Sequence, residues 1–305
     1  MSWCYKYLTF LMLAIALLPL SAIAGASQDA TTSDVSTIQN LSCAGSAPKV
    51  RPKTQNTTGW QERPDFGKYF QQAGVEGTFL LYDLKQKQYL VYNPQRANTS
   101  IIPVSTFKIF NSLVALETGV IQDENEVIKS DGTPQKFPNW NQDQTMRSAI
   151  AGSVIWFYQE LARRIGQERM QRYINLANYG NQDISGGIDQ FWLKGDLRIS
   201  PKQQIDLLVK LYQNKLPFSQ KTMATVKEIL INEKTNDYIL RGKTGWGWDF
   251  TPQVGWYVGY LERGDRVYFF ALNMDINKPE DTKARMAITK DILRSMGLLG
   301  AGSRE

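Results

Sequence analysis

The sequence predicts an α+β fold: an antiparallel sheet built from both ends of the chain, flanked by helices, with a helical lobe inserted in the middle. Three observations support this prediction. Runs rich in β-branched and aromatic residues occur at 78–92 and return at 237–274. Between them, from about 120 to 220, the pattern is mostly helical and is divided by Gly and Pro. A last helical stretch at 280–296 closes the fold.

Residues 1–58 are expected to comprise a targeting segment followed by a flexible leader. Residues 1–24 have the pattern of a secretory signal peptide, in which an apolar run ends at the small-residue cleavage pattern Ala22-Ile23-Ala24. A membrane anchor is the alternative, but the run is short for a span of ~20 residues and Pro19 interrupts it. Residues 25–58 are rich in Ser, Thr, Ala, Gln and Asn and predict a flexible leader. We therefore expect a periplasmic or secreted protein with no stable membrane span after cleavage.

A single domain is expected over 59–300. Runs at 78–83 and 88–92 predict a hairpin. A second hairpin is predicted by the runs at 254–262 and 267–274, which flank the turn sequence Arg263-Gly264-Asp265. The sheet lobe would comprise about 59–103 and 232–300, and the helical lobe about 104–231.

Composition excludes several classes of function. The 305 residues are 42% hydrophobic, which suffices for a packed core. The net charge of +6 is spread along the chain without a basic run, so no nucleic-acid partner is expected. The absence of histidine removes every Ser-His and Cys-His catalytic pair and the commonest metal ligand. Cys4 and Cys43 are too few for a structural zinc site, so no metal is expected. Because Cys4 lies in the signal peptide, Cys43 would remain without a disulfide partner.

One lysine stands in an unfavourable place. In the helix expected over 105–117, apolar side chains cover most of the circumference, which indicates a buried helix. Lys108 lies within this pattern. Burial penalises the ammonium form, so the pKa of Lys108 falls and the neutral amine becomes available as a base. Ser105 opens the helix three residues earlier and shares a face with Lys108.

Such a Ser-x-x-Lys pair can activate a serine without histidine. Backbone N–H groups and the positive end of the helix dipole near Ser105 would stabilise an oxyanion. The motif alone is weak evidence, because about one match is expected by chance in a chain of this length. A second match, Ser46-Ala47-Pro48-Lys49, lies in the leader, where Pro48 prevents a helix.

Two further elements strengthen the hypothesis. Lys243-Thr244-Gly245 follows the strand expected at 237–243, where Lys243 would attract an anion and the strand edge would hold an amide-like substrate. A solvated strand end is the alternative. Ser153 begins another expected helix, either as a plain N-cap or as a hydroxyl directed into the site.

In combination, these motifs resemble the class D β-lactamases, the oxacillinases. The resemblance covers about 60–296 and rests on elements in the same order: Ser105-Thr106-Phe107-Lys108, Ser153-Val154-Ile155, Tyr179-Gly180-Asn181, Phe191-Trp192-Leu193, Lys243-Thr244-Gly245, Gly255-Trp256-Tyr257-Val258-Gly259, the run 269–275, and Arg285. One departure is Ile155, where the family has Val; the added methylene leaves the chemistry intact.

The resemblance implies a β-lactamase/transpeptidase-like fold and hydrolysis of the β-lactam amide through an acyl-enzyme, without a metal. Ser105 would be the nucleophile. Lys108 would be carbamylated by CO2 or bicarbonate and act as general base in both acylation and deacylation. Trp192 would hold the carbamate through its indole N–H. Ser153 and Lys243 would relay a proton to the leaving nitrogen.

The resemblance also implies how substrate would be held. It assigns substrate binding to five residues: Thr244, Gly245, Trp246, Arg285 and Tyr179. Thr244 and Arg285 would bind the substrate carboxylate, and the N–H groups of Ser105 and Trp246 would form the oxyanion hole. Tyr179 would shape a wall, since an ordinary phenol stays protonated at pH 7. Ile155 and Leu193 would form an apolar gate over Lys108.

Three other functions fit part of the pattern. A penicillin-binding protein or D,D-peptidase shares both lysine motifs but deacylates slowly, and Trp192 and the apolar gate argue against it. A β-lactam sensor domain needs a membrane-spanning signalling segment, which is not expected after cleavage of 1–24. A non-catalytic periplasmic binding protein would use the same polar residues only to line a cleft. The aromatic run 246–250 suggests a walled pocket, whereas the preferred β-lactams and a possible homodimer are not encoded in a recognisable form.

Overall fold

One seven-stranded sheet organises the fold. The strands of the computed structural model, which describes residues 59–300, are β1 (Trp60–Glu62), β2 (Gly77–Asp83), β3 (Gln88–Tyr92), β4 (Ile231–Lys234), β5 (Ile239–Gly247), β6 (Gln253–Arg263) and β7 (Arg266–Ile276). Their order in the sheet is β1-β3-β2-β7-β6-β5-β4, so β2 from the beginning of the domain pairs with β7 from its end. This arrangement confirms the predicted α+β fold with a sheet made from both ends of the chain. The difference is at one edge, where β1 pairs with β3 in parallel and makes the sheet mixed.

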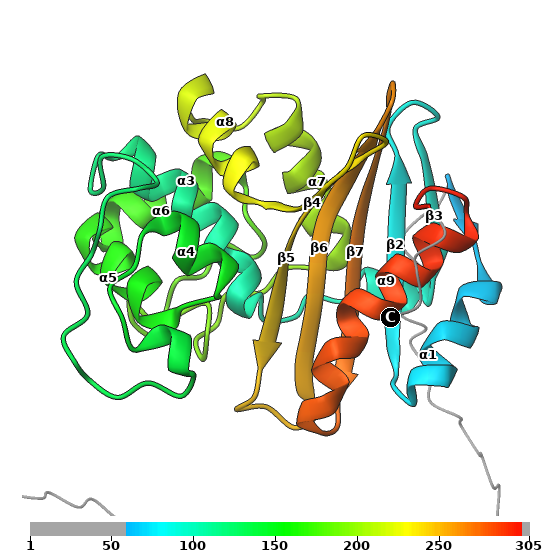
Figure 1. Ribbon diagram of the computed structural model, residues 1–305, viewed down its shortest axis with the longest axis horizontal. Helices are drawn as coiled ribbons and strands as arrows, with labels where there is room; N and C mark the ends of the chain where they lie inside the picture. Colours follow the sequence, from blue (N-terminus) through cyan, green and yellow to red (C-terminus); the bar gives the residue numbers. More distant parts are fainter. Residues whose placement is uncertain (1–58, 301–305) are drawn as a thin grey trace, which may run out of the picture. The chain divides into compact units, whose positions relative to one another are not determined.

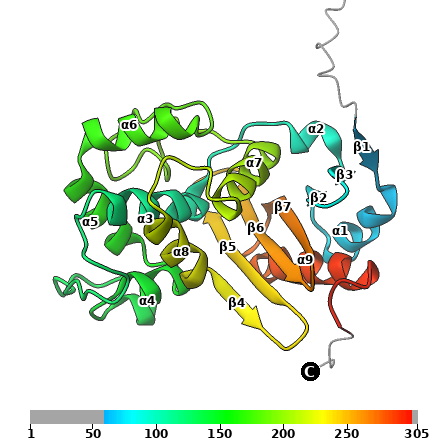
Figure 2. The ribbon, with the colours of Figure 1, turned by 90° about the horizontal axis from the view of Figure 1, so that it is seen from above.

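Helices cover both faces of this sheet (Figures 1 and 2). They are α1 (Gly67–Ala73), α2 (Pro94–Ala97), α3 (Lys108–Glu117), α4 (Met146–Ala151), α5 (Ile155–Ile165), α6 (Gln167–Ala177), α7 (Pro201–Tyr212), α8 (Gln220–Ile229) and α9 (Ala284–Ser295). Helices α1 and α9 contact each other, and α9 packs on β6 and β7. Helix α7 packs on the same two strands from the opposite face, and α3, α5 and α8 extend the helical lobe beyond it.

Successive side chains along each strand point alternately into two hydrophobic cores. Along β2, Phe79 and Leu81 face the core formed with α1 and α9, and Leu80 faces the core of the helical lobe. Along β7, Phe270 belongs to the first core and Phe269 to the second. Because side chains alternate along a strand and both faces are covered, these strands read as continuous apolar runs in the sequence.

Two local details differ from the sequence expectations. The helix expected from 105 starts instead as a 3₁₀ turn over Val104–Phe107, and α3 itself begins at Lys108. Ser153 does not cap α5, whose N-cap is Val154; it lies in the turn between α4 and α5 with a positive φ of 55°. The proposed signal peptide and leader lie outside the described residues. Within 59–300, no helix combines the length and apolar character needed to cross a bilayer.

Candidate active site

Ser105 and Lys108 meet at the start of α3. Side chains three residues apart are eclipsed in a 3₁₀ turn, so the turn over Val104–Phe107 stacks the two groups. The Lys108 Nζ donates a hydrogen bond to Ser105 Oγ at 2.7 Å. Lys108 is 0% exposed and Ser105 is 6% exposed, so the amine is enclosed while the hydroxyl retains access to solvent. The predicted serine–lysine pair is therefore formed in the structure.

The surroundings of Lys108 favour the neutral amine. Burial lowers the pKa of Lys108 well below its usual value, and the positive charge of Lys243 lowers it further. The aromatic ring of Tyr158 is also nearby, with its centroid 5.5 Å from the Lys108 Nζ. Such a lowered pKa makes the free lone pair of the amine more accessible, which is the condition for base or nucleophile chemistry.

The backbone beside the nucleophile is strained. Val104 has a φ of +44°, a conformation that β-branched residues rarely adopt. Such strain persists only where the surrounding structure enforces it, and it occurs preferentially at functional sites. Val104 is fully buried within the core of the helical lobe. The sequence contained no signal for this feature, because nothing in Pro103-Val104-Ser105 marks a positive φ.

Lys243 and Ser153 form a second lysine–serine pair. The Lys243 Nζ donates to Ser153 Oγ at 3.0 Å and to the carbonyl oxygen of Thr244 at 3.0 Å. Burial, with repulsion from Arg285, lowers the pKa of Lys243 to about 7. Near neutral pH this amine is thus divided between its protonated and neutral forms, which suits a group that gives and regains a proton.

The serines of the two pairs, Ser105 and Ser153, line one cavity of about 280 Å³. Its polar lining includes Ser105, Ser153, Thr244 and Arg285, and its wall is aromatic. The aromatic residues are Phe137, Trp140, Trp246 and Trp248. The structure therefore brings together most of the residues that the sequence motifs single out. Phe137 and Trp140 come from a loop that no motif indicated.

Arg285 lies in the first turn of α9, and hydrogen bonds to two main-chain oxygens position its guanidinium group. Its Nε donates to Thr282 O and its Nη1 to Gly245 O, both at 2.6 Å. These bonds leave Nη2 for an incoming anion in the cavity, and burial lowers the pKa of Arg285 to about 10, so it remains charged at neutral pH. Gly245 permits this packing of β5, since a Cβ there would lie 2.9 Å from Val104 Cγ2.

The two residues of the predicted gate line a neighbouring cavity. Ile155, at the first position of α5, and Leu193 both border a cavity of about 310 Å³. This second cavity shares Trp140, Trp246 and Trp248 with the cavity of Ser105. Both residues are half-buried and apolar and border the same cavity, and their role as a gate over Lys108 stays a prediction.

Trp192 is a fully buried side chain with an unpaired donor. Its ring is stacked on Phe107 at a centroid distance of 5.3 Å, and Phe107 directly precedes Lys108. Within 59–300, the indole Nε1 has no hydrogen-bond partner. Buried donors are nearly always satisfied, so this indole N–H is available to an acceptor that residues 59–300 do not provide.

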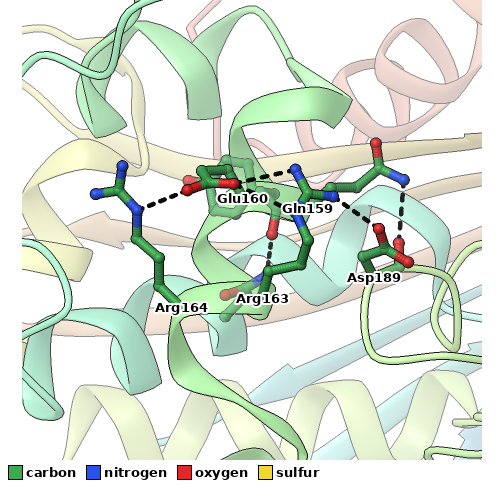
Figure 3. A network of polar contacts seen from close by, with 7 residues as sticks. Gln159, Glu160, Arg163, Arg164 and Asp189 are labelled. Carbon is green, nitrogen blue, oxygen red and sulfur yellow. Dashed lines mark hydrogen bonds and ion pairs between the residues drawn. The ribbon is translucent and has the colours of Figure 1, made fainter. Parts of the chain in front are cut away.

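A polar network holds the segment that carries Trp192 against α5 (Figure 3). Arg163 donates to the Asp189 carboxylate at 2.7 Å and to Glu160 at 3.1 Å. Gln159, one turn before Arg163, donates to the main-chain oxygen of Asp189 at 3.2 Å. Ile155 begins the same helix, so the network joins the helix that carries Ile155 to the segment that carries Trp192 and Leu193.

Tyr179 is not brought to this site. It is buried in the aromatic core, where its ring centroid lies 4.9 Å from that of Phe110 and 5.4 Å from that of Phe107. It borders neither of the two cavities above. The ring supports the α3 turn from behind, and burial raises the pKa of its phenol, so a direct contact with substrate is not what the structure indicates. The sequence motif around Tyr179 marks a packing position.

The described part of the chain offers no set of side chains that could bind a metal ion. Residues 59–300 contain no cluster of three or more His, Cys, Asp or Glu side chains placed to bind a metal ion. Among the described residues, the charged residue that lines the cavity of Ser105 is Arg285, and its positive charge favours an anionic ligand.

Comparisons with known proteins identify relatives of this chain. A family model described as penicillin binding protein transpeptidase domain matches residues 46–294. Beta-lactamase OXA-48 of Klebsiella pneumoniae is 43% identical over 235 residues, which cover 77% of this chain and 89% of that protein. A probable beta-lactamase YbxI of Bacillus subtilis is 45% identical over 226 residues, covering 74% and 82%.

Solved structures show the same relationship. The class D beta-lactamase YbXI from Nostoc has a TM-score of 0.76 and 50% identity, covering 77% of this chain and 99% of its own. The class D enzyme FUS-1 from Fusobacterium nucleatum has a TM-score of 0.77 and 40% identity, covering 79% and 100%. Sequence identity, fold and the order of the lysine and serine motifs all lead to one family: this chain belongs to the class D β-lactamases.

Proposed function

We propose that this protein hydrolyses the amide of β-lactams through an ester on Ser105, with carbamylated Lys108 as the general base. The observation that carries the proposal is the enclosed amine of Lys108, hydrogen-bonded at 2.7 Å to a hydroxyl that faces a cavity. The relatives are named beta-lactamases, which supports the choice of a β-lactam as substrate.

In acylation, Ser105 Oγ forms a bond to the lactam carbonyl carbon, and its proton passes to the Lys108 side chain. The carbon–nitrogen bond of the ring then breaks. The leaving nitrogen takes the proton of the Ser153 hydroxyl, which Lys243 restores across their 3.0 Å hydrogen bond. Arg285 and Thr244, which line the same cavity, hold the substrate carboxylate.

Before deacylation, Lys108 gives up the proton that it took from Ser105, and Lys243 regains the one that it lost, both by exchange with solvent. In deacylation, water attacks the ester carbon, and the Lys108 side chain takes a proton from that water and passes it to the departing Ser105 oxygen. The bond to Ser105 Oγ breaks, and the serine regains its proton. The proposed gate residues Ile155 and Leu193 border the adjoining cavity, from which this water would enter. The same base thus serves both halves of the reaction.

The residues around Lys108 fit a carbamate. Only an unprotonated amine reacts with CO2, and burial keeps the pKa of Lys108 low. The unpaired Nε1 of Trp192 is a donor for which such an acceptor would provide a partner. CO2 bound to the amine would supply a carboxylate that can accept a proton.

A penicillin-binding D,D-peptidase is the alternative, and the matching family description includes that class. It predicts a stable acyl-enzyme, whereas the buried Trp192 with its unpaired Nε1, and the proposed gate of Ile155 and Leu193, favour rapid deacylation. Export to the periplasm or medium remains a proposal that rests on 1–24, and a homodimer stays a prediction.

One experiment separates these functions. The purified protein is incubated with a chromogenic β-lactam in CO2-depleted buffer, with and without added bicarbonate. We expect many turnovers that bicarbonate accelerates. A single stoichiometric burst would contradict the hydrolase and indicate the peptidase. Near-normal turnover by Lys108→Ala would contradict the assigned base.

A further inference from the structure

Lys136 places a positive charge at the entrance of the second cavity. Its ammonium lies 4.2 Å from the ring centroid of Trp248 and 5.0 Å from that of Trp246, distances typical of cation–π contacts. The side chain is exposed, and it borders the cavity that also contains Ile155 and Leu193. Within the described residues, none of the ion pairs includes Lys136.

The other charges at this cavity compensate each other. Lys194 and Asp249 also border it and form an ion pair at 3.2 Å. The remaining polar lining consists of neutral amides from Gln135, Gln159 and Gln190. Lys136 therefore determines the net charge that a ligand meets here, which is +1.

The rest of the wall suits an aromatic group. The apolar lining consists of Val104, Trp140, Ile155, Leu193, Trp246, Trp248 and Phe250. All three of these tryptophans also line the cavity of Ser105, so the two cavities adjoin. A substrate with its carbonyl at Ser105 and its carboxylate at Arg285 has the second cavity available for the acyl side chain.

We propose that Lys136 is a specificity-determining residue that favours β-lactams whose aromatic acyl side chain carries a second negative charge. The inference rests on the proposed function, because it assumes that a β-lactam is bound through Ser105 and Arg285. The aromatic ring would lie among the indoles, and the anionic substituent would pair with the ammonium that now stands over Trp248. A cationic substituent at the same atom would be repelled.

Three penicillins test this directly, because they differ only in the substituent on the side-chain α-carbon. Benzylpenicillin carries hydrogen, carbenicillin a carboxylate and ampicillin an ammonium group. The second-order rate constant of acylation is measured for each by intact-mass spectrometry in competition, and turnover is measured in parallel. The variants are Lys136→Met, which keeps an apolar chain over Trp248, and Lys136→Arg, which keeps the charge. Lys129→Met removes an exposed lysine that borders neither cavity and serves as the control.

We expect Lys136→Met to lower the acylation rate constant of carbenicillin about fivefold relative to benzylpenicillin, the upper range for an exposed ion pair. The same variant should raise that of ampicillin relative to benzylpenicillin. Lys136→Arg and Lys129→Met should keep the wild-type order, and high salt should weaken the preference in the wild type.

Equal changes for all three penicillins in Lys136→Met would overturn the inference, since Lys136 would then only support the indoles. Acylation that shows the expected charge preference but no turnover would refute hydrolysis and leave the specificity assignment intact. Fast turnover without any charge preference would do the reverse.

Discussion

Replacing Trp192 with Phe tests the carbamate without relying on catalysis. The indole Nε1 is buried and has no partner within 59–300. A hydrogen bond from this donor to a charged acceptor is worth about 1.5–3 kcal/mol. Phenylalanine keeps the contact with the Phe107 ring, which is stacked on Trp192 at 5.3 Å, but it has no donor. Since 1.4 kcal/mol corresponds to a factor of about ten, Trp192→Phe should weaken CO2 binding about 10- to 100-fold.

The assay is thermodynamic and spectroscopic. Bicarbonate that provides CO2 at about 100 times the wild-type dissociation constant adds about 2.7 kcal/mol to the free energy of unfolding. If the variant binds about 30-fold more weakly, the same concentration adds only about 0.9 kcal/mol. Chemical denaturation with and without bicarbonate measures this difference, and ¹³C NMR with labelled bicarbonate detects the carbamate itself.

Two results would refute the reasoning. A carbamate signal of equal intensity in wild type and Trp192→Phe at limiting bicarbonate would show that the indole donor is not its partner. No signal in the wild type, together with no stabilisation by bicarbonate, would show that Lys108 acts as a plain amine. Lys108→Ala is the control, because it removes the reacting nitrogen and must abolish both effects.

Three further outcomes follow from the site. Burial lowers the pKa of Lys243 to about 7, so above that pH the unfolded state binds more protons than the folded state. The free energy of unfolding should therefore rise between about pH 7 and 10 by up to about 1.4 kcal/mol per pH unit. Chemical denaturation of Lys243→Met should show a pH dependence of the free energy of unfolding that is smaller by this amount. Gly245→Ala would place a methyl group 2.9 Å from Val104 and displace β5, so steady-state kinetics should show kcat/KM reduced about 10- to 100-fold; an unchanged value would contradict the tight packing. Asp189→Asn weakens the network that holds the Trp192 segment, so turnover should need more bicarbonate, whereas Glu124→Gln, which weakens a distant surface ion pair, should not change this need.

Residues close together in the chain were predicted well because helical geometry relates them directly. Ser105 and Lys108 share a face in any helical turn, and the apolar side chains around Lys108 predicted its burial before any tertiary contact was known. The strand runs were also readable, because side chains buried on both faces leave continuous apolar segments. The local conformation was less accessible. The positive φ of Val104 and of Ser153 is enforced by packing and not by residue type.

The sequence by itself thus determined which chemical groups are present: a serine and a buried lysine three residues apart, a second lysine at a strand end, and no histidine. Only the tertiary structure decided which of them meet. Lys243 of the sheet lobe reaches Ser153 of the helical lobe across 90 residues, and within the helical lobe the Trp192 ring stacks on Phe107, the residue before Lys108. It also placed Tyr179 behind the site and Lys136 in front of it. Such juxtapositions depend on the summed packing of distant segments, which no local spacing encodes.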